Sequence, residues 1–329
     1  MALILLTSTA NDDLARYSKR DYERLLNYST LDSVRHHCLT DSPEAADIIL
    51  YVGSSESGYM DVRKCALYKA YPRKSVLFES GDRIIPLLPG IYAGLQKNWA
   101  ALSCGAALSG FYIRVAENDS LDISEPIEDC RYLYSFIGSV RNHRVRGTVL
   151  RLQDSRAFLK DSSQDSVQQA DGVLGNNKDR GILFRDVMAN SKFVLCPRGI
   201  GVSSWRLFET MRSGRVPVVI SDQWVPPIGP DWRSFCVFVR EREVSTIPRL
   251  LAEMEGEAPL LGRRAREQWL RFYDRNVIFN TVVDLGLIAL EHFRKRNRWL
   301  YPLRRLQYLD PFFARHWLVS PWVKKHIKG

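Results

Sequence analysis

The stretch SKFVLCPRGIGVSSWRLFETMRSGRVPVVISDQW, residues 191–224, predicts a strand, a glycine-containing turn, a helix and a second strand in one short span. Residues 193–196 form an apolar run of strand length, residues 197–201 interrupt it, and residues 216–220 return to β-branched, extended character. Two strands joined by one helix are expected to be parallel neighbours in a sheet. The stretch therefore predicts a ligand-binding βαβ unit.

The turn between the two strands predicts an anion site. Gly199 and Gly201 allow the backbone to come close to a ligand, and Ser203 or Ser204 can cap the helix that follows. The free N–H groups and the positive end of the helix dipole favour a phosphate group at this position.

Two arginines and a glutamate extend this prediction to a nucleotide. Arg198 and Arg206 supply guanidinium groups suited to bidentate phosphate contacts. Glu209 follows Arg206 by three residues on the same helix face, where its carboxylate can accept hydrogen bonds from ribose hydroxyls. The alternative is an ordinary exposed ion pair between Arg206 and Glu209, worth about 0.2–0.5 kcal/mol.

A nicotinamide dinucleotide site is a second alternative. Residues 199–204 read G-x-G-x-x-S, and Asp222 lies 21 residues after Gly201, close to the spacing of a ribose-binding acid. However, Ser204 replaces the third glycine of that pattern, and a proline and an arginine directly precede the turn. A nucleotide-binding oxidoreductase therefore stays open as the less favoured function.

The same stretch resembles the signature of the exostosin-like glycosyltransferases, which runs C-x-x-P-R-G, then S-x-R-x-x-E, then a V-P-V strand ending in serine. Here it appears as residues 196–199, with the cysteine directly before the proline, followed by residues 204–209 and 216–221. Upstream, residues 134–141 resemble the F-x-G-x-x-R strand and turn that open the family's nucleotide-sugar domain. In the N-terminal half the resemblance, to bacterial members, is loose.

This resemblance implies an α/β fold of two Rossmann-like domains facing a cleft, the GT-B type, with the donor in the C-terminal half and the acceptor in the N-terminal half. It implies that Arg141, Arg198 and Arg206 neutralise the donor diphosphate and that Glu209 holds the ribose. The complete set of expected donor-binding residues is Gly138, Arg141, Arg198, Gly199, Gly201, Ser203, Ser204, Arg206 and Glu209.

The implied reaction is an inverting transfer from a UDP-sugar or similar nucleotide sugar to a glycan acceptor. A base is expected to take the acceptor proton, and Glu79 and Asp82 are the candidates because they follow a predicted strand at residues 75–79. The alternative for Asp82 is a purely structural part in the turn of residues 80–82.

No metal or further cofactor is expected. The six cysteines include no C-x-x-C pair, His36 and His37 are adjacent rather than one helical turn apart, and no Asp-x-Asp pair is present. Guanidinium groups and a helix N-terminus can stabilise the leaving diphosphate without a metal. No G-x-S-x-G elbow follows a strand, so hydrolysis is not indicated either.

Length and composition agree with two domains. A chain of 329 residues with 45% hydrophobic residues is sufficient for two buried cores. We expect an N-terminal acceptor domain at residues 1–125, a nucleotide-sugar domain at 126–261, and C-terminal helices with a basic tail at 262–329, of which a helix returns to the first domain. The predicted strands cover residues 3–6, 46–52, 75–79, 132–137, 193–196, 216–220 and 235–239.

Positive charge is concentrated at the C-terminus. Residues 291–329 hold ten Lys or Arg and two acids, which is 10 − 2 = +8 of the net charge of +10, interleaved with aromatic residues. This pattern indicates contact with an anionic membrane surface, or a tail packed on the fold. Nucleic acid is not expected as a partner, because no recognition motif accompanies the charge.

The expected location is the cytoplasm, at the inner face of a bacterial membrane, where the acceptor would be a lipid-linked glycan. No signal peptide or spanning segment is visible, and unpaired cysteines agree with a reducing compartment. A catalytically silent partner of another transferase is the second function that the sequence leaves open.

Overall fold

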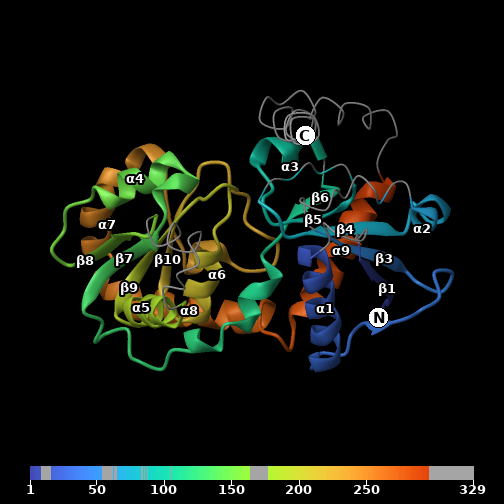
Figure 1. The fold of residues 1–329 in the computed structure, drawn as a ribbon, viewed down its shortest axis with the longest axis horizontal. Helices are drawn as coiled ribbons and strands as arrows, with labels where there is room; N and C mark the ends of the chain where they lie inside the picture. The colour runs from blue at the N-terminus through green and yellow to red at the C-terminus, as the bar shows by residue number, and fades with distance from the viewer. Residues whose placement is uncertain are drawn as a thin grey trace, which may run out of the picture.

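The computed structural model describes residues 1–8, 16–53, 62, 65–82, 84, 86, 88–103, 105–163 and 177–295, with the backbone alone at 16–18 and 177–180. The described residues form two sheets of parallel strands, and the two sheets lie side by side (Figure 1). The predicted α/β fold with two Rossmann-like halves is confirmed. The basic tail from residue 296 onward, and with it the predicted membrane contact, lies outside the described residues.

The first sheet has the strand order β2-β1-β3-β4-β5-β6. Its strands are β1 (Leu3–Ser8), β2 (Cys38–Leu39), β3 (Ile48–Gly53), β4 (Ser75–Glu79), β5 (Gly90–Tyr92) and β6 (Ala107–Ser109). Leu50 and Val76 face a core shared with α1 (Arg16–Leu31) and α9 (Ile278–Lys295), whereas Ile49 and Leu77 face a separate core beside α3 (Lys97–Ser103). Helices therefore cover both faces, as a parallel sheet requires.

The second sheet has the order β11-β10-β9-β7-β8. Its strands are β7 (Tyr132–Gly138), β8 (Ala157–Asp161), β9 (Ser191–Pro197), β10 (Val216–Ile220) and β11 (Val237–Val239). The expected βαβ unit is present, because β9 and β10 pair in parallel, with Leu195 opposite Val218, and α6 (Trp205–Arg212) connects them. The remaining helices are α2 (Ala66–Ala70), α4 (Arg144–Leu150), α5 (Asn177–Ala189), α7 (Ile247–Glu253) and α8 (Ala258–Phe272).

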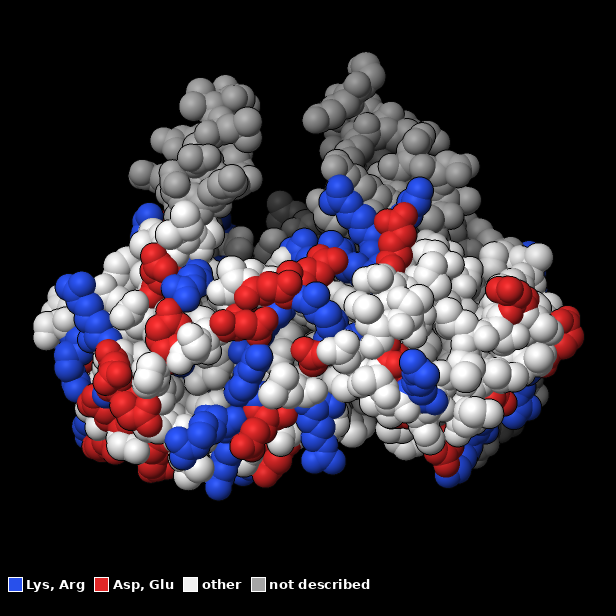
Figure 2. All heavy atoms as spheres, turned by 90° about the horizontal axis from the view of Figure 1, so that it is seen from below, with Lys and Arg blue, Asp and Glu red and all other residues white. Residues whose placement is uncertain are grey.

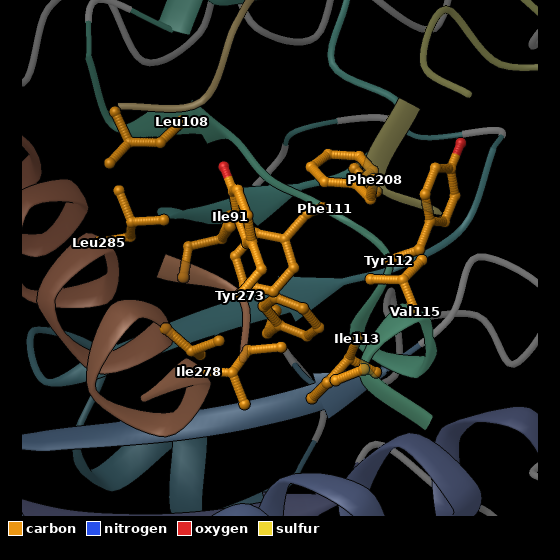
Figure 3. Close-up of a cluster of buried hydrophobic side chains, with 14 of the residues drawn as sticks. Ile91, Leu108, Phe111, Tyr112, Ile113, Val115, Phe208, Tyr273, Ile278 and Leu285 are labelled. Carbon is orange, nitrogen blue, oxygen red and sulfur yellow. The ribbon is translucent and has the colours of Figure 1, made fainter. Parts of the chain in front are cut away.

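The two halves share one hydrophobic core. Phe111 from the connecting segment packs against Tyr273, with ring centroids 4.9 Å apart, and Phe208 of α6 packs against the same tyrosine at 5.2 Å. Figure 3 shows these rings beside Ile91 of the first sheet and Ile278 at the start of α9. The helix that carries Arg206 and Glu209 is thus packed between the two sheets.

The last described helix returns to the first sheet, as expected. Gly286 of α9 lies so close to Ile48 that a Cβ at residue 286 would come within 2.9 Å of the isoleucine side chain. Further along α9, the His292 ring is hydrogen-bonded to the Gly105 carbonyl at 3.0 Å, and Arg294 donates to the Arg73 carbonyl at 3.0 Å. The C-terminal part of the described chain therefore belongs structurally to the N-terminal half.

No helix among the described residues is both long enough and apolar enough to cross a bilayer. Figure 2 shows one face of the molecule, on which basic and acidic side chains are interspersed over the half that holds the second sheet and along the junction of the halves. On this face the basic side chains of the described residues do not form one broad patch.

Candidate donor-binding site

The strand order of the second sheet reverses between β7 and β9, and the region outside the carboxyl ends of these two strands is called the crevice here. From β7 the chain pairs with β8 on one side and with β9 on the other, so the loops that follow β7 and β9 diverge. In open α/β sheets, ligands bind outside the carboxyl ends of the strands at such a reversal. Gly138 ends β7 and residues 198–204 follow β9, so the expected donor-binding loops from two distant segments meet here.

The turn after β9 presents a series of backbone N–H groups. Within the described part of the chain, the amides of residues 199–205 donate no hydrogen bond, whereas Arg198 donates to the Ile220 carbonyl at 3.0 Å. Ser204 occupies the N-cap position of α6, but its side chain does not cap the helix, so that detail of the prediction was wrong. Unpaired amides at a helix N-terminus are the groups that bind anions.

The two glycines of this turn make room for side chains of the chain itself. A Cβ on Gly201 would lie 2.7 Å from Oδ1 of Asp82 and 3.1 Å from its Cα, and a Cβ on Gly199 would lie 3.1 Å from Nη2 of Arg146. The space beside these glycines, where the sequence predicted a ligand, is therefore occupied by Asp82 from the first half and Arg146 from the second.

Replacing Gly201 with alanine is expected to destabilise the fold by about 1–3 kcal/mol, because the new methyl group would overlap Asp82. Gly256→Ala is the matched control, since no atom lies within 4 Å of a Cβ at that position. Chemical unfolding of the two variants compares the costs. Equal stability of both would show that Asp82 does not pack on the turn.

Arg146 joins the two loops of the crevice. Its Nε donates to the Arg198 carbonyl at 2.9 Å, and Nη1 and Nη2 reach the carbonyls of Ser139 and Pro197 at 3.4 Å each. Only 8% of the residue is exposed, and none of the described ion pairs includes it. Burial, followed by the charge of Arg206, lowers its pKa to about 10. Arg146 is thus a buried cation with no described carboxylate within 4.0 Å, although the charge of Asp82 acts on it and partly opposes the lowering of its pKa.

Sequence reasoning chose Arg141 from the basic run of residues 141–146 and missed Arg146. Arg141 is exposed, its backbone N–H donates to Ser139 Oγ at 3.2 Å, and its guanidinium has no hydrogen bond or ion pair with the residues that the structure describes. Arg146, in contrast, shares the buried face of α4 with Val145 and Val149. The sequence signal that could have identified Arg146 is its position within the apolar face of the predicted helix, beside Val145 and Val149.

The other two expected phosphate-binding arginines point in different directions. Arg198 extends toward Glu241, with Nη1 4.0 Å from Oε1, and burial lowers its pKa. Arg206 donates to the Ile137 carbonyl and lies over the Phe136 ring, with the guanidinium carbon 5.0 Å from the ring centre. The three arginines proposed from the sequence therefore do not form one cluster.

Glu209 does not form the exposed ion pair that was the alternative. No hydrogen bond or ion pair of its carboxylate is present among the described residues, because Arg206 is directed to β7. Burial raises the pKa of Glu209, and the charges of Arg206 and Arg114 only partly oppose that shift. A half-buried carboxylate with unused acceptors is suited to ribose hydroxyls.

The two candidate bases have different surroundings. Glu79 is fully buried at the end of β4, and its Oε1 accepts the Gly81 N–H at 2.8 Å, so Glu79 closes the turn. Asp82 faces the other half, where its Oδ1 accepts the Tyr112 hydroxyl at 2.7 Å. Burial, then the charge of Asp82, raises the pKa of Tyr112. Asp82 is consequently the carboxylate that reaches the donor loops.

Comparison with known proteins gives a family match over the middle of the chain. The Exostosin GT47 domain model matches residues 111–254. The exostosin-1 homolog of Caenorhabditis elegans is 43% identical over 96 residues, which is 29% of this chain and 23% of that protein. A probable glycosyltransferase of Arabidopsis thaliana is 41% identical over 98 residues, which is 29% of this chain and 17% of that protein. The chain thus spans less than a quarter of the length of these relatives.

Among solved structures, the lipopolysaccharide outer core galactosyltransferase WaaB is similar at a TM-score of 0.42 and 11% identity, over 89% of this chain and 98% of that one. The family match covers the β7 loop, the turn after β9, α6 and β10, which are the segments that form the crevice. Residues 111–254 therefore match the exostosin GT47 domain, in the stretch where the signature predicted that resemblance.

Proposed function

We propose that this chain is a glycosyltransferase that moves a sugar from a nucleoside-diphosphate sugar, UDP-linked, to a glycan acceptor. One observation carries the proposal: unpaired N–H groups at the start of α6 lie beside the buried Arg146 guanidinium, which forms no ion pair with any carboxylate of the described residues. Diphosphate is the ligand that satisfies both features. The exostosin domain match supports the reaction class.

In this proposal the amides of residues 199–205 and Arg146 hold the diphosphate, with Arg198 and Arg141 adding charge at its edges. The Glu209 carboxylate accepts hydrogen bonds from the ribose. These cations and the helix N-terminus stabilise the charge that develops on the leaving diphosphate, so the mechanism requires no metal.

Asp82 is the proposed base. The acceptor oxygen forms a bond to the anomeric carbon on the face opposite the diphosphate, while the bond from that carbon to the phosphate oxygen breaks. The acceptor proton passes to the Asp82 carboxylate, and the electron pair leaves with the diphosphate, which inverts the anomeric centre. The Tyr112 hydroxyl holds Asp82 in place.

The setting of the reaction is proposed from the sequence alone. A cytoplasmic enzyme that docks on an anionic membrane through residues 291–329 would meet a lipid-linked glycan acceptor. The main alternative is a catalytically silent partner subunit. Unlike a glycosyltransferase, it would release no nucleoside diphosphate from any donor.

Release of nucleoside diphosphate from a panel of sugar nucleotides, with and without acceptor glycans, tests the function. The wild type is expected to release it from at least one UDP-sugar. Glu209→Gln, which keeps the shape but removes the charge, is expected to raise the donor KM about tenfold through the weakened ribose contact. Glu253→Gln, on an exposed carboxylate of α7, is the control. Absence of release from every donor would contradict the proposal and favour the silent partner.

A further inference from the structure

A second pocket lies at the carboxyl ends of β10 and β11, on the far side of β9 from the donor crevice. Its volume is about 670 Å³, within the range of about 300–1,000 Å³ that is usual for small-ligand sites. It is lined from β10 and its loop by Ser221 and Asp222 and from β11 by Phe238. None of the residues proposed to bind the donor lines it.

The pocket spans the junction of the two halves. Lys97, the first residue of α3, lines it from the first half, and its Nζ donates to the Asp222 carbonyl at 2.6 Å. The Lys97 N–H also donates to the Gln223 carbonyl at 3.0 Å. These two hydrogen bonds hold Lys97, a cation of the N-terminal half, above strands of the C-terminal half. In the proposed function, the acceptor would meet the donor between these halves.

Positive charge exceeds negative charge in this pocket. Four cationic and two carboxylate side chains line the pocket. Glu243 Oε1 forms ion pairs with Arg240 Nη1 at 3.8 Å and with Arg242 Nε at 3.5 Å. The other carboxylate, Asp222, accepts the Glu241 N–H at 3.1 Å. Within the described chain, Lys97 and Arg233 have no carboxylate within 4.0 Å. Two cations are therefore available for an anionic ligand.

An exposed aromatic ring lies among these charges. Phe238 is 47% exposed although Val237 and Val239 on either side of it are buried. Its ring stacks on the buried Trp224, with centroids 6.3 Å apart and planes 23° from parallel, so it is held in place. A fixed, exposed aromatic face is suited to the C–H face of a sugar ring.

We propose that this pocket binds an acidic sugar of the acceptor glycan. Its ring would lie on Phe238, and its carboxylate, sulfate or phosphate would contact Arg233 and Lys97. The identification of the sugar as part of the acceptor rests on the proposed function. An acidic sugar could also arrive as part of the donor, and the test separates the two sources.

The probes are trigalacturonic acid, its methyl ester, UDP-glucuronic acid and UDP-glucose, with affinities measured by calorimetry on the whole chain. The acid trisaccharide is expected to bind at least tenfold more tightly than its ester. Arg233→Gln is expected to weaken binding of the acid about fivefold or more, and Phe238→Ala to weaken both trisaccharides. Arg249→Gln, an exposed arginine of α7, is the matched control and is expected to change nothing.

Preference for UDP-glucuronic acid over UDP-glucose that disappears in Arg233→Gln would assign the acidic sugar to the donor and overturn the acceptor assignment. Equal binding of acid and ester, no binding of the acid, or equal losses in Arg233→Gln and Arg249→Gln would overturn the site itself. Release of nucleoside diphosphate measured without an acceptor glycan does not depend on this pocket. Its persistence when trisaccharide binding fails would leave the proposed function intact.

Discussion

Arg146→Gln is expected to lower kcat/KM for the nucleotide-sugar donor by about 100- to 1,000-fold, the size of effect seen when one charge-stabilising donor is removed from an active site. Arg146 is the cation that bonds to both donor loops, through the carbonyls of Ser139, Pro197 and Arg198. Glutamine removes the charge and cannot reach all three carbonyls. Diphosphate would then lose a ligand, and the crevice would lose its shape.

The same substitution is expected to cost about 2–3 kcal/mol of stability, because buried carbonyls lose their donor. Arg144→Gln is the control: Arg144 is exposed on the same helix. Donor affinity by calorimetry, measured below the unfolding transition, separates the two effects, and Arg146→Lys should restore part of the affinity through its charge. Wild-type donor affinity in folded Arg146→Gln would exclude Arg146 from the donor site.

Arg212→Met is expected to lower the free energy of unfolding by about 2–3 kcal/mol, as much as Arg146→Gln. Arg212 ends α6, and its side chain is 4% exposed. It donates to the Ala116 carbonyl at 2.9 Å and pairs with Asp119 and Asp122 at 2.6 Å each, all three in the segment that connects the halves. Because both aspartates are accessible to water, the cost is placed below that of a fully buried pair.

The pH dependence of this loss provides a second measurement. Burial acts to raise the pKa of Asp122, but the hydrogen bond and charge of Arg212, then those of Arg266, lower it overall. A carboxyl whose pKa is lowered on folding contributes stability fully above its unfolded pKa, about 3.9, and loses it as the pH falls through the folded pKa. The difference between wild type and Arg212→Met should therefore narrow below about pH 4.

Arg249→Met, at an exposed i,i+4 pair, is the control for both measurements and should cost less than about 0.5 kcal/mol. Chemical unfolding at pH 7 and at pH 3.5 gives the comparison. A stability difference at pH 7 no larger than that of the control would show that the Arg212 cluster does not hold the halves together.

The sequence predicted the strands whose pattern is continuous. Predicted residues 75–79 and 216–220 coincide with β4 and β10, since both are buried on all sides and rich in apolar residues. It missed β2, β5, β6 and β8. Of these, β5 and β6 have three residues each and include glycine, alanine and serine. Such strands form because neighbouring strands pair with them, a tertiary effect that local propensity does not carry.

The last predicted strand was too long at its start. Residues 235 and 236 instead follow a 3₁₀ helix at Trp232–Ser234, and the Cys236 N–H donates to the Trp232 carbonyl at 3.0 Å. Phe235 is apolar because it packs in the shared core, so burial without strand pairing produced the same hydrophobic signal.

The elements that form the candidate site were predictable from the sequence, but the contacts within it were not. The glycine turn and α6 were predicted from residue spacing. Which arginine lies in the crevice depends on how α4 packs on the sheet. The residues of the run 141–146 do not determine that packing by themselves. Likewise, the contact of Gly201 with Asp82 joins residues more than a hundred positions apart. Such contacts between the two halves depend on how the halves pack together, which local sequence patterns do not predict.

The most direct test of the central claim is a structure of the chain with a UDP-sugar bound. We expect diphosphate oxygens about 2.7–3.1 Å from the N–H groups of residues 199–205, with Arg146 at the same phosphates. A sugar nucleotide bound elsewhere, with those amides still unpaired and Asp82 still packed on Gly201, would contradict it.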